Sequence, residues 1–217
     1  VFAGLDRTLA DPALAWGSRV DSAPMATTLI AVVIALALGH AAPGFARSFR
    51  DHGWYCRWLG WLDGKLLQGE GFWRGRHGIV VALLPPLLAV LLFQLALGEP
   101  LLGLAGLLFA IAVLFYCWGP RDLDVDVDAV LSAEDAATRQ AAAHRLGAAS
   151  AAGPALVTAV FRGAQRRWFG VLLWFLVLGP FGALLYRLSA LSAEGDAADL
   201  LPAETRAGAR TLHAWLD

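Results

Sequence analysis

The stretch 168–188, WFGVLLWFLVLGPFGALLYRL, constrains this chain most, because it carries no charged residue before Arg187. At about 1.5 Å per residue, a helix of this length matches the hydrocarbon core of a bilayer. Arg166 and Arg167 precede the stretch, and Tyr186 and Arg187 close it. Cationic and aromatic anchors at both ends are typical of a helix that crosses a membrane. We therefore predict a membrane-spanning helix over 168–188.

Gly179 and Pro180 interrupt the middle of this predicted helix. Proline removes a backbone donor, and glycine lets a neighbouring chain approach closely. In hydrocarbon, such a break needs packed helices, side chains or water to satisfy the freed carbonyl group. Two interpretations stay open. One is a kinked structural helix, which is the commoner case, and the other is a helix that lines a functional cavity.

The composition agrees with a membrane protein. Only 16% of the 217 residues are charged and 58% are hydrophobic, whereas about a quarter of a soluble domain is charged. A net charge of −1 gives no basic field for nucleic acid. Cys56 and Cys117 fit no metal or redox spacing, so we interpret them as packing thiols. The predicted class is an all-α polytopic membrane protein, with no cofactor, metal or catalytic residues expected.

Four spans are predicted, at 27–46, 78–97, 101–118 and 168–188. The first has the shortest fully apolar part and is the weakest of the four. Residues 1–24 precede the single Met25 and have no signal-peptide pattern, so we interpret them as a start-site extension, with a genuine tail as the alternative. Residues 25–217 then form one membrane domain, and the abrupt end suggests a chain shortened at its C-terminus.

The loops between the predicted spans are polar. The loop 47–77 interleaves tryptophans with arginines and predicts an amphipathic helix on the lipid headgroups. In the loop 119–167, Asp124, Asp126 and Asp128 resemble the start of a calcium loop. Its sixth position is an alanine and its twelfth an aspartate, where glycine and glutamate are needed, so we expect solvated or capping carboxylates instead.

A capping box is predicted further along the same loop. Ser132 is followed three residues later by Asp135, which predicts that a helix opens at Ser132.

The distribution of basic residues predicts the orientation. The loops 47–77 and 119–167 contain twelve of the seventeen lysines and arginines. The positive-inside rule then places both loops in the cytoplasm and both termini outside. With a straight helix over 168–188, Arg187, Glu194 and Asp196 would lie across the membrane from Arg162, Arg166 and Arg167.

Three blocks of the sequence resemble the AmpE family of inner-membrane proteins. They are MATTLIAVVIALALGHAAPGFARSFRD with WYCRWLGWLDGKL, then YCWGPRDLDVDVDAVL, and RRWFGVLLWFLVLGPFGALLYRL. The resemblance begins at Met25 and implies a multi-pass protein of the bacterial inner membrane. It also implies an accessory role in cell-wall-recycling signalling and β-lactamase induction, with the lipid bilayer and a membrane or cytoplasmic protein as partners.

The AmpE family is in turn similar to the CobD/CbiB membrane synthases, which form an amide in cobalamin biosynthesis. The acidic residues those enzymes place beside this helix are missing from FRGAQRRWF and displaced in LSALSAEGD. The resemblance therefore implies a protein that is not an enzyme, with the ATP-dependent synthase as the alternative and a purely structural membrane protein also open. The candidate packing, cavity or headgroup residues are Gly179, Pro180, Arg166, Arg167, Tyr186 and Arg187.

Overall fold

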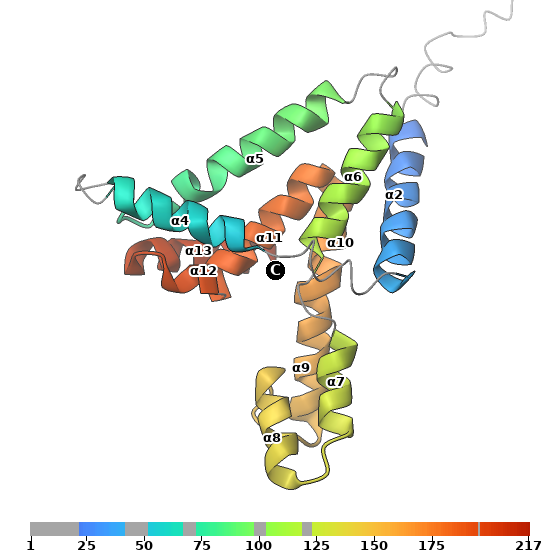
Figure 1. Ribbon diagram of the computed structural model, residues 1–217, viewed down its shortest axis with the longest axis vertical. Coiled ribbons are helices and arrows are strands. Elements are labelled where there is room, and N and C mark those ends of the chain that lie inside the picture. The colour runs from blue at the N-terminus through green and yellow to red at the C-terminus, as the bar shows by residue number, and fades with distance from the viewer. Residues whose placement is uncertain (1–21, 42–51, 67–72, 98–102, 119–122, 195) are drawn as a thin grey trace, which may run out of the picture.

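The computed structural model describes residues 22–41, 52–66, 73–97, 103–118, 123–194 and 196–217 (Figure 1). These residues form helices and connecting turns, and they contain no strand, which confirms the all-α class for the described part of the chain. One described helix, α5 (Gly78–Ala96), is long and apolar enough to cross a membrane. Two shorter apolar segments are Thr28–Ala37 and Gly103–Cys117.

Three apolar helices occupy the upper part of the molecule in Figure 1: α2 (Ser22–Ala41), α5 and α6 (Gly103–Cys117). Helix α2 packs against α6, and its buried alanines Ala31 and Ala35 are one helical turn apart. Small side chains at this spacing let two helix backbones approach closely. The predicted spans 78–97 and 101–118 thus correspond to α5 and α6, whereas residues 42–46 of the first predicted span lie outside the described residues.

Helix α4 (Gly53–Leu66) is the amphipathic segment expected within the loop 47–77. Its buried Tyr55, Leu59 and Leu62 recur at helical spacing, while Trp61 is exposed. The helix lies beside α12 (Asp196–Asp199), near the lower end of α5 (Figure 1). The hydroxyl groups of Tyr55 and Ser192 are 2.7 Å apart, which ties α4 to a helix far along the chain.

A separate group of short helices lies at the bottom of Figure 1: α7 (Leu123–Leu131), α8 (Ala136–Arg145) and α9 (Pro154–Ala164). Helix α8 begins at Ala136 and not at Ser132, so the predicted capping box is wrong in its position. The cap is Asp135, whose carboxylate accepts a 2.7 Å hydrogen bond from the Thr138 amide. The Thr138 hydroxyl also donates to this carboxylate at 2.7 Å. The two hydrogen bonds hold the pKa of Asp135 below its usual value.

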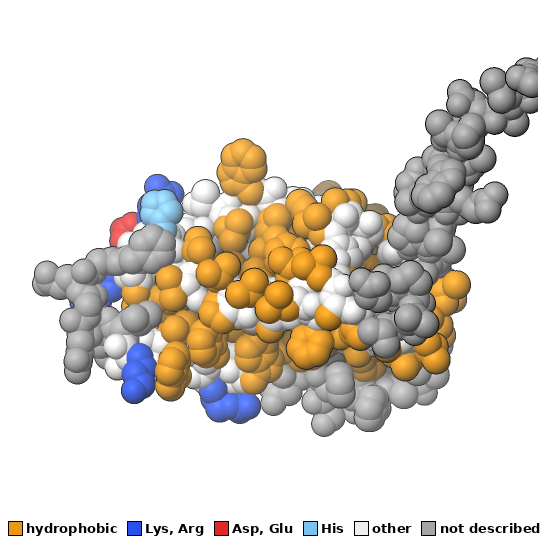
Figure 2. Space-filling view, turned by 90° about the horizontal axis from the view of Figure 1, so that it is seen from above, with side chains coloured by type: hydrophobic (Ala, Val, Ile, Leu, Met, Phe, Trp, Pro, Cys, Tyr) orange, Lys and Arg blue, Asp and Glu red, His pale blue; other side chains and the backbone are white. Residues whose placement is uncertain are grey.

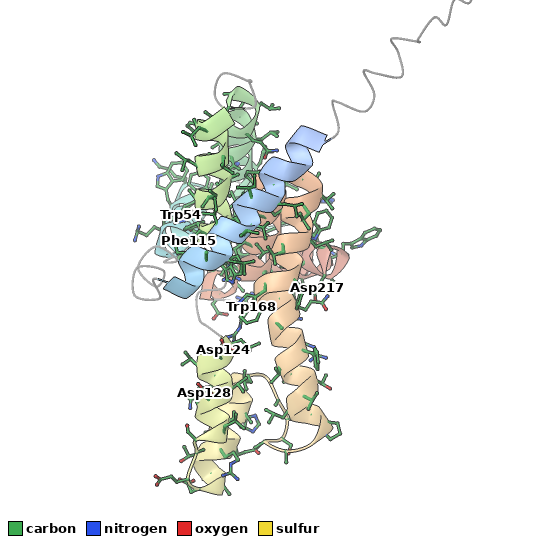
Figure 3. All side chains as sticks on the ribbon, turned by 90° about the vertical axis from the view of Figure 1, so that its right-hand side faces the viewer. Trp54, Phe115, Asp124, Asp128, Trp168 and Asp217 are labelled. Atoms are coloured by element: carbon green, nitrogen blue, oxygen red, sulfur yellow. The ribbon has the colours of Figure 1, made fainter. Side chains whose placement is uncertain are left out.

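The stretch that resembled a calcium loop is helical. Asp124, Asp126 and Asp128 all lie on α7, where Figure 3 labels the first and last of them. Asp126 is buried while the other two are exposed, because a helix turns residues two positions apart toward different sides. Of the three alternating aspartates, one therefore has a structural role inside the protein and two are solvated.

The predicted single span 168–188 is wrong. Helix α9 continues through a π-helical turn, η2 (Gln165–Phe169), into α10 (Gly170–Leu178), which ends at Gly179. Helix α11 (Pro180–Glu194) then runs back along α10 as the second arm of a hairpin (Figure 1). Helix α10 has nine residues and is roughly 13 Å long at 1.5 Å per residue, too short to cross a bilayer.

The reversal follows from the two residues at the break. Gly179 has φ 67° and ψ −152°, a conformation that is essentially restricted to glycine. Pro180 follows at the first position of α11, where its missing amide hydrogen costs no helical hydrogen bond. A kinked but continuous helix was the commoner interpretation of this pair; the backbone at Gly179 instead turns the chain through a hairpin.

A polar side chain from α5 satisfies the backbone at the break. The Gln94 amide Nε2 donates to the Leu178 carbonyl oxygen at 3.2 Å, and the Phe181 amide donates to Gln94 Oε1 at 3.0 Å. Gln94 lies in an otherwise apolar helix. It supplies hydrogen-bond partners to backbone groups that the break between the two helices leaves free.

The hairpin brings the C-terminal part of the chain back beside the start of α5. Helix α13 (Ala203–Leu216) packs against α11 and against the start of α5. The Thr205 hydroxyl donates to the Gly75 carbonyl at 3.2 Å, and a Cβ added at Gly208 would lie 2.0 Å from the Arg76 carbonyl oxygen. The C-terminal helix thus packs against residues 75–78, which the predicted topology places on the opposite side of a bilayer.

Candidate functional site

A cavity of about 500 Å³ lies at the base of the hairpin. Its walls come from the end of α8, from α9, η2 and α11, and from α13. Basic residues dominate its lining, in which five arginines accompany a single carboxylate, Glu194. The arginines are Arg145, Arg162, Arg166, Arg167 and Arg187.

Arg166 and Arg167 are adjacent on the π-helical turn, but they form ion pairs with different parts of the chain. Arg166 forms a salt bridge with Glu194 on α11, and its Nε lies 3.6 Å from Asp217 Oδ2. Arg167 Nη1 donates to Asp126 Oδ2 on α7 at 2.9 Å. A π turn inserted into an α-helix is frequent at functional sites. Here the turn lies where the helix passes from the α7–α9 group to the hairpin.

The ion pair between Arg167 and Asp126 links α7 to the continuous helix of α9, η2 and α10. Asp126 is 4% exposed and the Arg167 side chain 22%. A buried carboxylate is stable only when a charged partner and hydrogen bonds compensate its lost hydration. Asp126 is therefore a structural anchor for α7 beneath the cavity.

Arg187 is buried in the wall of the cavity. It is 5% exposed, and neither Nε nor Nη2 has a hydrogen-bond partner among the described residues. No salt bridge among the described residues joins Arg187 to a carboxylate. Buried cations are almost always paired. Arg187 is thus the polar group of the cavity that most needs explanation.

A hydrogen-bonded cluster closes the cavity on the α13 side. The Tyr186 hydroxyl donates to Asp217 Oδ1 at 2.8 Å, and Ser189 Oγ lies 3.3 Å from His213 Nδ1. Figure 3 shows Asp217 beside the long helix of α9 and α10, where the Gln165 amide donates to its backbone oxygen at 3.1 Å. Burial lowers the pKa of His213, although Asp217 opposes that shift. The folded state therefore favours a neutral imidazole at this wall.

Serine, histidine and aspartate meet in this cluster, but they do not form a nucleophilic triad. Ser189 is completely buried and donates to the Tyr186 carbonyl at 2.7 Å. The Asp217 carboxylate accepts from Tyr186 and does not orient the His213 ring through a hydrogen bond. A nucleophile needs both access to substrate and a base that is held in position. The cluster supports the wall of the cavity.

The structure brings together residues that the predicted topology had separated. Arg187 and Glu194 share one cavity with Arg162, Arg166 and Arg167, so the expectation that the membrane divides them is wrong. Asp196 begins α12, and its side chain lies outside the described part of the structure. Of the other candidates, Tyr186 supports the cavity from α11, whereas Gly179 and Pro180 lie at the tip of the hairpin.

Sequence reasoning missed Asp126, His213 and Asp217 as parts of this region. Each reaches it through a contact between residues distant in the sequence, which no local motif announces. Among the described residues, no group of three or more histidines, cysteines or carboxylates could hold a metal ion. The described cavity has the charge to bind an anion.

Searches of family models, curated proteins and solved structures find no match to this chain.

Proposed function

We propose that the protein is a polytopic protein of the bacterial inner membrane. Helices α2, α5 and α6 cross the bilayer, and the α10–α11 hairpin enters from one side and returns to it. Large apolar side chains exposed on these helices support the proposal, because a soluble protein rarely exposes so many together. They include Leu29, Val33, Leu92, Phe93, Leu104, Leu108, Leu173, Leu176 and Val177. Figure 2 shows hydrophobic side chains dominating the face seen from above.

The hairpin strengthens the argument for orientation. Every lysine and arginine except Arg7 and Arg19 lies in 47–76 or 121–210. In the proposed topology, all of these segments are on one side of the membrane. The positive-inside rule makes that side the cytoplasm. The arginine cavity then opens on the cytoplasmic side.

Reporter fusions test this topology at three points. Fusions after Lys65, after Ala148 and after Asp217 are expected to behave as cytoplasmic, because the hairpin returns the chain. The C-terminal fusion decides the matter. A straight helix over 168–188 would place it in the periplasm while leaving the first two cytoplasmic, so periplasmic activity after Asp217 would contradict the hairpin.

We infer that this proposed membrane protein has an AmpE-like accessory function. The protein receives an anionic signal in the arginine cavity and passes it to a partner in cell-wall-recycling signalling. The observation that supports this function is Arg187, which lines a cavity between the hairpin and the α7–α9 group. It is a buried cation whose Nε and Nη2 have no hydrogen-bond partner in the described part of the chain. A ligand there would contact both parts and could change how they pack.

Gene deletion tests the function. Deletion is expected to alter β-lactamase induction in a host that has this pathway, and wild-type protein to restore it. The Arg187→Met variant is expected not to restore induction, even when its amount in the membrane equals that of the wild-type protein. The matched control is Arg74→Gln, which removes an exposed arginine that does not line the cavity. Unchanged induction after deletion would reject the signalling role.

A CobD-like synthase is the second candidate, because Arg166, Arg187 and Glu194 share one cavity. A bilayer does not separate these residues in the proposed topology, so they could contact one substrate. The purified full chain can be assayed for amide formation from a corrinoid acid and a phosphorylated amine, with ATP and magnesium present. We expect no product. Product formation that is abolished by Glu194→Gln would favour the enzyme over the accessory protein.

A further inference from the structure

We propose that the arginine cavity binds a doubly charged phosphate group, carried by a soluble phosphate ester or by a lipid headgroup. This inference rests on the proposed function only in that the cavity receives an anion. It names the chemistry of that anion, and it does not depend on the signalling pathway.

The balance of charge in the cavity favours a ligand that carries more than one negative charge. Two of the five arginines are neutralised within the protein, Arg166 by Glu194 and Asp217, and Arg167 by Asp126. The other three, Arg145, Arg162 and Arg187, have no ion pair among the described residues. A carboxylate would leave most of this charge uncompensated. A phosphate dianion or a diphosphate compensates more of it.

The position of Arg187 identifies the point of attachment. An exposed arginine can remain hydrated, but Arg187 is only 5% exposed, and its Nε and Nη2 have no hydrogen-bond partner within the described ranges. Guanidinium nitrogens form a planar fork that matches two phosphate oxygens. A phosphate at this wall would accept from Arg187, while the exposed Arg162 and Arg145 could close over its remaining oxygens.

The remainder of the lining accommodates an organic group. Leu146, Ala159, Ala190 and Leu191 contribute apolar surface beside the arginines. A cavity of about 500 Å³ is within the usual range for small-molecule sites and much larger than a bare phosphate needs. The ligand is therefore expected to be an ester whose phosphate meets Arg187 and whose organic part meets the apolar wall.

Calorimetry on the full chain in detergent micelles tests the proposal, with inorganic pyrophosphate and phosphate as probes and acetate at equal ionic strength for comparison. Pyrophosphate and phosphate are expected to bind and to raise the melting temperature, and acetate to do neither. The Arg187→Met variant is expected to weaken pyrophosphate binding by about tenfold or more, because a charge-assisted contact is lost. Without ligand it should melt at a higher temperature, because an unpaired buried charge is removed.

These opposite effects separate a binding residue from a structural one. If Arg187 only supported the fold, its replacement would lower the melting temperature and leave pyrophosphate affinity unchanged, which would overturn the proposal. The exposed Arg74→Gln variant removes the same charge and is expected to change neither quantity by much. If Arg187→Met does not fold, Arg187→Lys keeps the charge without the fork and should bind pyrophosphate about tenfold more weakly. Wild-type affinity in that variant would reject the assigned contact.

Nanodiscs of phosphatidylcholine, with and without phosphatidic acid, distinguish the two sources of phosphate. A lipid ligand is expected to compete with pyrophosphate only in discs that contain phosphatidic acid, and the competition should disappear in Arg187→Met. A soluble ligand predicts equal pyrophosphate binding in both discs. No binding of any phosphate probe would overturn the proposed site. Unchanged β-lactamase induction after deletion would instead reject the signalling role and leave the site intact.

Discussion

Replacing Gly182 with alanine is expected to destabilise the α10–α11 hairpin severely. A Cβ at this position would lie 2.1 Å from the carbonyl oxygen of Trp174 and 2.7 Å from Cβ of Leu178. The first contact is with backbone, so no side-chain rotation can relieve it, and the two helices must separate. Overpacking of this kind costs about 3 kcal/mol. Unfolding by sodium dodecyl sulfate in mixed micelles would measure the loss.

Gly103→Ala is the matched control for this substitution. Gly103 also lies in an apolar helix, but a Cβ there meets no atom within 4 Å. The same change of residue type should therefore have little effect on stability. Equal stability of the Gly182→Ala and Gly103→Ala variants would show that α10 and α11 are not in close contact, and it would restore the straight helix over 168–188.

The class of the fold was predictable from the sequence, because it depends on short-range patterns. The apolar run that became α5 and the tryptophan-rich segment that became α4 both follow from helical spacing of apolar residues. The hairpin was not predictable in the same way. A Gly-Pro pair permits either a kink or a reversal. The choice depends on Gly170 and Gly182, which let the arms approach, and on Gln94 from another helix.

The candidate site shows the same limit. Arg166, Arg167 and Arg187 were found because they flank an apolar stretch, but their expected role was to anchor one helix at two interfaces. The reversal at Gly179 converts those two ends into two walls of one cavity. Their partners Asp126 and Glu194 lie far away in sequence, so only the folded chain reveals which arginines are neutralised.

The Arg167–Asp126 ion pair adds to the apolar contacts that hold α7 beside the long helix, and Asp126→Asn is expected to weaken the attachment of α7 strongly. The carboxylate is 4% exposed and lies 2.9 Å from Arg167 Nη1. Removing one partner of a buried pair leaves the other charge uncompensated and costs about 3–5 kcal/mol. Arg167 keeps some contact with solvent, so we expect about 2–3 kcal/mol here. Hydrogen exchange should increase in α7, and the midpoint of thermal unfolding should fall.

The two neighbouring aspartates on α7 provide a control within the same helix. Asp124→Asn and Asp128→Asn remove the same charge from exposed positions and are expected to change the unfolding free energy by less than about 0.5 kcal/mol. A double variant then separates the ion pair from the charge itself. Combining Asp126→Asn with Arg167→Met removes the uncompensated cation and should recover part of the lost stability, giving a favourable coupling energy. Additive losses would show that Asp126 stabilises α7 through contacts other than Arg167. An effect of Asp124→Asn as large as that of Asp126→Asn would show that net charge, and not this pair, controls the attachment of α7.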